Sequence, residues 1–326
     1  MQKMIIVLKE INMQDILFNE KEHKYYDNFG NTYISVTTII GKYTDTFNPY
    51  YWGMFTGLKD NGYDRLKPDN DEKFIIIAGV KYKIEDLHKD TRFKAWYEFT
   101  VAKWNVINIE ACDRGNATHN ELENNINISK GDYSGGTNGM ILPNSGKSNN
   151  GFVISTEHDL SKTNLEEKYP EVYNRLIGYI NRGCSIFAEK RVFLESFRVA
   201  GMIDVPIIKG NKFCILDWKT NKDTLHKTSG YYRKQKVNGM WVKTTEWIEN
   251  GKCFKYPLNN LQCSKFNIYA LQLSLYAYIL EQWGFILAEG GLEIMHFPLG
   301  EKPKLIKIPY LKEEVEIMLN HYKHSA

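Results

Sequence analysis

The segment from Gly201 to Thr220 restricts the fold of this chain more than any other part of the sequence. Two apolar stretches, MIDVPIIK and KFCILDWKT, flank the dipeptide Gly210-Asn211. Glycine at the first position suits a two-residue hairpin turn, and such a turn places Lys209 opposite Lys212. The sequence therefore predicts an antiparallel hairpin in which the pairing partner of every residue can be counted from the turn.

Counted in this way, the hairpin brings two carboxylates together. Asp204 falls opposite Asp217, with Cβ atoms about 4.5–5.5 Å apart, and Lys219 points to the same face as Asp217. Two such carboxylates repel unless a cation, a shared proton or an arginine compensates. Mg²⁺ or Mn²⁺ is the simplest compensator, and a lysine beside it would orient or deprotonate an attacking water. The alternative is a solvated hairpin end with an incidental cluster of charges, and a bulge at Pro206 would shift the register.

Motifs outside the hairpin extend this pattern. The hairpin holds Gly-x-x-Asp at 201–204 and Asp-Trp-Lys-Thr at 217–220; the upstream stretch 113–123 holds Gly-x-x-x-His, and residues 272–276 read Gln-x-x-x-Tyr. In this order the four motifs resemble those of the PD-(D/E)XK nucleases, RecB-like branch. The likeness is closest to the mitochondrial genome maintenance exonucleases and their phage relatives, which share Asp-Trp-Lys-Thr and a Ser-Val-Thr segment, here at 35–37.

The resemblance implies a metal-dependent deoxyribonuclease that leaves a 5′-phosphate and a 3′-hydroxyl. It makes Asp204, Asp217 and Lys219 the catalytic residues. It also implies that Mg²⁺ or Mn²⁺ is held by His119, Asp204, Asp217 and the backbone carbonyl of Trp218. Glu123, one helical turn after His119, is either an acceptor for the imidazole N–H or a solvated charge. Glu189 either approaches the site or pairs with basic neighbours at the surface.

Two groups of residues are candidates for binding DNA. Tyr269, Gln272 and Tyr276 share one face of a predicted helix; the resemblance implies contact with a DNA backbone, and the alternative is packing beside the sheet. The segment 219–256 carries nine Lys or Arg residues against three acidic ones, interleaved with aromatic residues. Such a mixture suits single-stranded DNA, because phosphates attract the cations and unpaired bases stack on the rings. Its proposed DNA contacts are Arg233, Lys234 and Lys236; the alternative is a solvated hairpin about Asn238-Gly239.

The pattern of strands framed by helices predicts an α/β (α+β) fold around one central sheet. The resemblance implies a PD-(D/E)XK core, with a central mixed sheet flanked by helices. We expect an N-terminal β-hairpin and helical region over 1–105 and a nuclease domain over 106–326. Within the nuclease domain we expect a flexible insertion at 126–164 and a basic-aromatic insertion at 221–262. Predicted helices cover 86–125, interrupted at Gly115, then 165–181, 266–283 and the end of the chain after Lys312. Predicted strands cover 33–39, 185–194, 197–208, 212–218 and 292–297, with hairpins about 28–31 and Gly79.

Composition narrows the remaining possibilities. The chain has 326 residues and a net charge of only +3, so a nucleic-acid interpretation rests on where the charges lie. Its five cysteines contain no CxxC, which argues against a disulfide framework and a zinc ribbon. The relatives in this family that hold an iron–sulfur cluster have a group of cysteines after the Gln-x-x-x-Tyr motif. No cysteine follows Gln272 in this chain, so we predict no iron–sulfur cluster. The first residues contain no apolar run long enough for a signal peptide or a membrane span, and we expect a cytoplasmic protein without a membrane partner.

These observations predict an exonuclease that acts on single-stranded DNA ends. One alternative is a structure-specific endonuclease or nickase with the same catalytic residues. The other is a non-catalytic DNA-binding protein that keeps a vestigial nuclease site.

Overall fold

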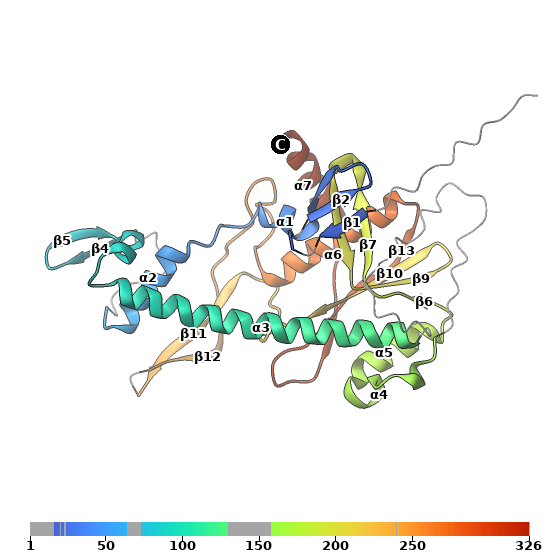
Figure 1. Ribbon diagram of the computed structural model, residues 1–326, viewed down its shortest axis with the longest axis horizontal. Helices are drawn as coiled ribbons and strands as arrows, with labels where there is room; N and C mark the ends of the chain where they lie inside the picture. Colours follow the sequence, from blue (N-terminus) through green and yellow to red (C-terminus); the bar gives the residue numbers. More distant parts are fainter. Residues whose placement is uncertain are drawn as a thin grey trace, which may run out of the picture. The chain divides into compact units, whose positions relative to one another are not determined.

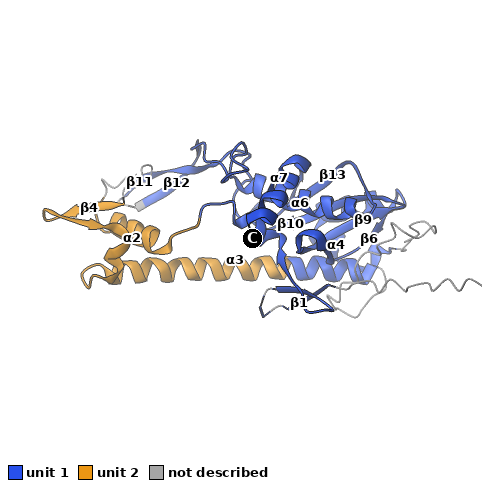
Figure 2. Cartoon of the chain, turned by 90° about the horizontal axis from the view of Figure 1, so that it is seen from above, with its two compact units in different colours: residues 1–45, 119–326 blue, residues 46–118 orange. Residues whose placement is uncertain are grey.

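The structure, a computed structural model, describes residues 16–19, 21–22, 24–63, 73–129, 158–238 and 240–325. The chain forms two compact units, residues 1–45 with 119–326, and residues 46–118 (Figure 2). This division differs from the predicted boundary at residue 105. The reason is that strand β3 (Thr32–Ser35) pairs in parallel with β8 (Val199–Ile203), which joins the N-terminal hairpin to the larger unit.

The smaller unit has its own apolar core. It contains helix α2 (Pro49–Asp60), strands β4 (Phe74–Ile77) and β5 (Val80–Lys83), the 3₁₀ helix η1 (Ile84–Lys89) and the first part of α3 (Lys94–Ser129). Met54 and Leu58 of α2 pack with Leu87 and Phe93. The predicted hairpin about Gly79 is confirmed, because Ile77 pairs with Val80.

Helix α3 corrects the prediction of a break at Gly115. It is one continuous helix of 36 residues, and its last part belongs to the larger unit (Figure 1). A helical glycine costs about 1 kcal/mol relative to alanine, which is small beside the burial of Leu122 and Ile126 one turn apart on the same face. Both side chains pack in the core of the larger unit.

The larger unit is a mixed α/β fold with two five-stranded mixed sheets, where the sequence predicted one central sheet. The first sheet has the order β1-β2-β3-β8-β7, and the second has the order β14-β13-β10-β9-β6. Their remaining strands are β1 (Ile16–Asn19), β2 (Lys24–Asp27), β6 (Ser185–Ile186), β7 (Lys190–Leu194), β9 (Val205–Lys209), β10 (Lys212–Lys219), β13 (Ile286–His296) and β14 (Lys304–Lys307). The chain crosses from the first sheet to the second at Asp204, between β8 and β9.

The register of the central hairpin agrees with the count from its turn. Lys209 pairs with Lys212, and the pairing continues without a shift through Pro206 with Ile215 and Val205 with Leu216. The ladder ends there, one step before the two aspartates. Beyond this point β10 remains paired in parallel with β13.

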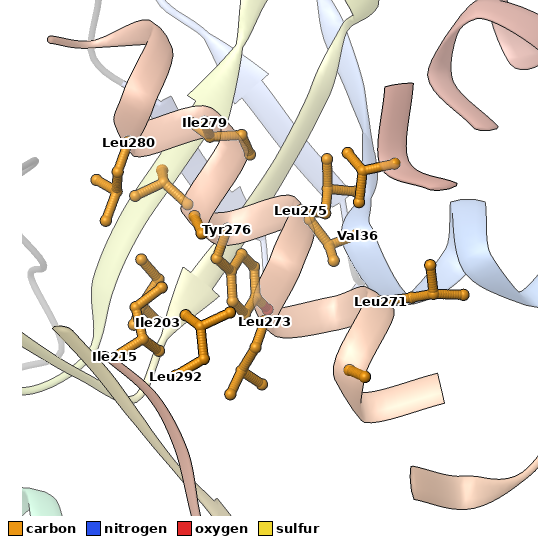
Figure 3. Close-up of a cluster of buried hydrophobic side chains, with 14 of the residues drawn as sticks. Val36, Ile203, Ile215, Leu271, Leu273, Leu275, Tyr276, Ile279, Leu280 and Leu292 are labelled. Atoms are coloured by element: carbon orange, nitrogen blue, oxygen red, sulfur yellow. The ribbon is translucent and has the colours of Figure 1, made fainter. Parts of the chain in front are cut away.

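Helices cover both faces of the second sheet. Alternate residues of β10 point to opposite faces: Phe213 and Ile215 pack with α6 (Lys265–Gln282), and Leu216 and Trp218 pack with α5 (Pro170–Ile180). Figure 3 shows the α6 side, where Tyr276 lies among apolar side chains of the sheet. Helices α4 (Leu165–Lys168) and α7 (Lys312–Ser325) complete the layers.

Three further predictions need correction. The β-branched run after Ser35 is not a strand but helix α1 (Val36–Gly41), because the hydroxyl of Ser35 accepts the amide of Thr38 and caps the helix. The predicted helix over 165–181 is divided into α4 and α5 at Pro170. At the ends of the predicted insertion 126–164, Ile126 and Leu160 are core residues; residues 130–157 lie outside the described part.

The predictions of two helices in the last part of the chain are confirmed in outline. The predicted helices near 266–283 and after Lys312 correspond to α6 and α7. Strands β11 (Gly230–Val237) and β12 (Met240–Glu249) form a hairpin in the basic-aromatic segment, as its alternative interpretation describes. Among the residues that the structure describes, no helix combines the length and the apolar character needed to cross a membrane.

The approach of Tyr276 to Gly201 gives a test of this packing. A Cβ atom at Gly201 would lie 2.6 Å from Cε1 of Tyr276, so we expect Gly201→Ala to lower the free energy of unfolding by about 1–3 kcal/mol. Gly41→Ala is the matched control, because nothing lies within 4 Å of the corresponding Cβ. Urea denaturation of both variants measures the difference. Equal stabilities would contradict the close packing of α6 on β8.

Candidate functional site

Asp204 lies at the corner between the two sheets. Its Oδ2 accepts a hydrogen bond of 2.9 Å from the backbone amide of Trp218, so the side chain reaches across to β10. Its own carbonyl accepts the amide of Glu189 at 2.8 Å, which brings the backbone of Glu189 to the corner. The corner therefore holds Asp204 beside β10 although the strand ladder has already ended.

Asp217 is fully buried on β10, with no exposed side-chain surface. Among the described residues, its carboxylate oxygens have no hydrogen-bond partner apart from the Lys219 ammonium, with which they form an ion pair. Burial and the nearby charge of Asp204 raise the pKa of Asp217 to about 6, against the opposing effects of Lys219 and His119. The site thus holds more negative than positive charge in a place that water does not reach.

Lys219 is held between this charge and an aromatic ring. Its Nζ lies 4.8 Å from the ring centroid of Tyr269 on α6. Burial alone would lower the pKa of Lys219, but Asp217 and Asp204 more than offset this effect and raise it. The side chain is therefore a positioned cation, directed to the aspartates as the two-residue spacing predicted.

His119 reaches the same place from the last part of α3. Its Nδ1 lies 3.6 Å from Oδ2 of Asp204, and 29% of its side chain is exposed. Glu123, one turn further, is buried, and this burial raises its pKa, with Asp204 acting in the same direction and Lys190 and His119 against it. Glu123 is thus close enough to affect the site, and a solvated surface charge is excluded.

The fit of this cluster to a divalent cation is incomplete as the side chains stand. Within the described ranges, no group of three His, Cys, Asp or Glu side chains is arranged to hold a metal ion. In the part of the chain that the structure describes, the buried oxygens of Asp217 nevertheless lack every partner except Lys219, and the charges of Asp204 and His119 act on them. Carboxylate oxygens are hard ligands, and the cluster carries more negative than positive charge. Both properties suit Mg²⁺ or Mn²⁺. The donor types of Asp204, Asp217 and His119 suit such an ion, and Lys219 occupies the place beside Asp217 in this structure.

The three α6 residues predicted to contact DNA lie in different environments. Tyr276 is only 3% exposed and packs against Gly201, and its hydroxyl accepts a hydrogen bond of 3.2 Å from the side chain of buried Gln272. For these two side chains the alternative of packing beside the sheet applies, because both are buried. Tyr269 donates its hydroxyl proton to Asn221 at 2.6 Å and lies directly beneath Lys219.

The three basic residues predicted to bind DNA all lie on the exposed strand β11. Arg233 forms an ion pair of 3.1 Å with Glu246, so its charge is partly neutralised within the hairpin. Lys236 lies 5.9 Å from the ring centroid of Trp241, which is 40% exposed. Lys234 also lines a pocket at the base of the hairpin. The structure brings these residues together on one hairpin but does not place them in the aspartate cluster.

The pocket at the base of the hairpin has a volume of about 500 Å³. Its wall includes Trp247, whose ring stacks on His226 with centroids 3.8 Å apart, and Tyr232, which meets Trp247 edge to face. Lys234 adds positive charge, whereas Lys243 forms an ion pair with Asp223, which also lines the pocket. Asn221 forms part of the lining. Since Asn221 bonds to Tyr269, the pocket begins next to the residues that support Lys219.

His296 is a site residue that the motifs did not indicate. It lies on β13 beside Lys219, and its Nε2–H donates to the carbonyl of Asn221 at 2.8 Å. Asn221 in turn accepts the hydroxyl proton of Tyr269. His296 therefore fixes the chain immediately after Lys219. No sequence signal pointed to it, because its partner is a backbone atom brought near by parallel strand pairing.

Comparisons of the chain with models of protein families, with curated proteins and with solved structures give no match.

The environment of His296 predicts a pH dependence of stability. Burial lowers the pKa of His296, with the hydrogen bond to Asn221 opposing this effect. At pH values below its ordinary pKa the unfolded chain binds a proton that the folded chain resists, so acid reduces stability through this group. We expect His296→Gln, which keeps a donor for Asn221, to lose less stability than the wild type between pH 7 and pH 5.

Denaturant titrations at several pH values measure this difference. His324→Gln, at an exposed position of α7, serves as the control and should follow the wild-type profile. Parallel profiles for all three proteins would show that His296 does not contribute to acid sensitivity.

Proposed function

We propose that the chain is a metal-dependent deoxyribonuclease of the PD-(D/E)XK type, acting as an exonuclease on single-stranded DNA. The observation that carries this proposal is the cluster of Asp204, fully buried Asp217 and paired Lys219. A structural ion pair requires one carboxylate for one lysine. The second carboxylate, held beside the first by the corner between the sheets, supports a site for a further cation.

Each side chain has a part in the proposed reaction. Asp204 and Asp217 would hold Mg²⁺ or Mn²⁺, with His119 beside Asp204 as a third ligand. Held by these residues, such an ion would supply Lewis-acid chemistry at the scissile phosphate. Lys219, held over Tyr269, places a positive charge near the same phosphate and orients the attacking water. Buried apolar residues around Asp217 keep the local dielectric low, which strengthens these interactions.

The hairpin β11–β12 is the feature that favours a single-stranded substrate in this proposal. Lys234, Lys236 and exposed Trp241 offer phosphate and base contacts along one element. The pocket beside Asn221 has aromatic walls, and it begins next to the residues that support Lys219. A strand guided along the hairpin would reach the aspartates without a duplex having to fit there.

A second candidate is a DNA-binding protein without catalysis. The observation that favours it is the direct ion pair between Lys219 and Asp217, which neutralises part of the proposed ligand set. The two candidates differ in whether a divalent ion binds. A circular single-stranded substrate separately distinguishes an exonuclease from an endonuclease or nickase, because an enzyme that requires ends leaves a circle intact.

Asp217→Asn tests the metal site. We expect cleavage of end-labelled single strands to fall by about a hundredfold or more, because the substitution removes an anionic ligand. Mn²⁺ at 100 times its dissociation constant should stabilise the wild type by about 2.7 kcal/mol and the variant much less. Without metal the variant should be at least as stable as the wild type, because a buried charge beside Asp204 is removed.

Thermal denaturation with and without Mn²⁺, together with the cleavage assay, provides the measurements. Asp159→Asn, at an aspartate outside the cluster, is the control and should retain both activity and Mn²⁺ stabilisation. Unchanged turnover of Asp217→Asn in Mg²⁺ would refute the assignment. Absence of Mn²⁺ stabilisation in the wild type would favour the non-catalytic candidate.

Substitutions in the hairpin test strand binding. Replacing Arg233, Lys234 and Lys236 by alanine should flatten the slope of log K against log salt by up to about 2 units, and less if the ion pair of Arg233 with Glu246 persists on binding. Trp241→Ala should weaken binding at every salt concentration with the slope unchanged, because stacking is worth about 1–3 kcal/mol per base. Fluorescence anisotropy with a labelled single strand measures both effects.

Alanine substitution of the exposed lysines Lys89, Lys103 and Lys302 removes the same charge elsewhere and is the control for the triple variant. We expect its salt slope to remain that of the wild type. If the triple hairpin variant and Trp241→Ala both bind as tightly as the wild type, the hairpin is a solvated surface and the preference for single strands loses its support.

A further inference from the structure

A second pocket, of about 330 Å³, lies on the α5 side of the second sheet. It shares no lining residue with the aspartate cluster or with the pocket at the base of β11–β12. Lys212 lies five residues before Asp217 on β10, which corresponds to about 16 Å along a strand. The pocket is therefore separate from the candidate active site. Its lining includes five basic side chains, Arg175, Arg182, Lys209, Lys212 and Lys307, and one acidic side chain, Glu289.

Two of the five cations are engaged by a buried carboxylate. Glu293 on β13 is fully buried, and Arg175 and Lys307 both form ion pairs with it. The hydroxyl of Tyr179 donates to the same carboxylate at 3.0 Å. This arrangement fixes Arg175 and Lys307 at the wall of the pocket and leaves their combined charge above that of Glu293.

The other three cations have no such partner. Lys209 and Lys212 face each other directly across the hairpin turn, an arrangement of like charges that destabilises a ladder. The Nζ of Lys209 donates to the carbonyl of Arg182 at 2.6 Å, which gathers the third cation at the same place. All three are exposed, and none forms an ion pair with any residue in the described ranges.

From this juxtaposition we propose that the pocket is a binding site for phosphate groups. Arginine and lysine donors are the usual ligands of phosphate, and the guanidinium of Arg182 offers paired N–H groups to its oxygens. A bound phosphate would relieve the repulsion between Lys209 and Lys212 and occupy the donors that Glu293 does not use. The phosphate belongs either to a free phosphorylated compound or to a nucleic-acid backbone, and both sources share this chemistry.

Isothermal titration calorimetry with inorganic pyrophosphate tests the site. The buffer contains EDTA, so that no metal at the aspartate cluster can bind the ligand. We expect Lys209→Gln/Lys212→Gln to raise the dissociation constant at least tenfold. Lys103→Gln/Lys302→Gln removes the same charge from other exposed positions and should bind as the wild type does. Arg182→Gln, on a different element, should weaken binding independently.

The outcomes separate the proposal from its alternatives. No heat of binding with the wild type, or equal losses in the pocket and control variants, would overturn it. A competition experiment in the same buffer uses a labelled single strand. If pyrophosphate displaces the strand and the pocket variant binds the strand more weakly, the site is assigned to a nucleic-acid backbone. If strand binding is unaffected both by pyrophosphate and by the pocket substitutions, the site is assigned to a free phosphorylated compound. Asp217→Asn should bind pyrophosphate normally, so failure of the nuclease proposal leaves this result intact.

Discussion

The constraint on which the larger unit depends is the burial of an unbalanced negative charge. Asp217 lies fully inside the protein, Asp204 is held beside it, and Lys219 neutralises only one of the two. Burying a carboxylate is expensive unless other interactions compensate. The surrounding packing must therefore be strong enough to maintain an arrangement that the electrostatics oppose, and the two helical layers on β10 provide it.

That packing also explains how distant segments meet. The corner after β8 brings Asp204 to β10, the parallel pairing of β13 brings His296 to Lys219, and the buried end of α3 carries His119. Each of these contacts depends on tertiary structure. The cluster is assembled by elements that are separated by long stretches of chain, and only its central hairpin is local.

The parts predictable from sequence are those governed by local rules. The turn at Gly210-Asn211 determined the pairing of β9 with β10, and helical periodicity located α6 and α7. Predictions were wrong where tertiary burial or a capping residue outweighed propensity, as at Gly115 within α3 and after Ser35 in α1. The second sheet, too, depends on long-range pairing that periodicity does not report.

The same local and non-local division applies to the candidate site. Counting from one turn predicts that Asp204, Asp217 and Lys219 meet, and they do lie together. The ladder itself ends one step before the aspartates, so the position of Asp204 depends on the corner after β8 and on its bond to the amide of Trp218. His296 could not be predicted in this way, because its partner is the backbone carbonyl of Asn221, in the segment that follows β10. The burial of Gln272 and Tyr276 depends on how closely α6 approaches Gly201, which helical periodicity alone does not determine.

The two-residue turn between β9 and β10 has a consequence for how this chain can change. Side chains alternate between the α6 face and the α5 face, so one inserted or deleted residue in the turn would exchange the faces of β10 relative to β9. A slip of this kind would remove Asp217 and Lys219 from the α6 side in a single step. The length of the turn sets the faces of β10, and its first residue is constrained as well, because Gly210 has a φ of 59°, a backbone conformation that favours glycine.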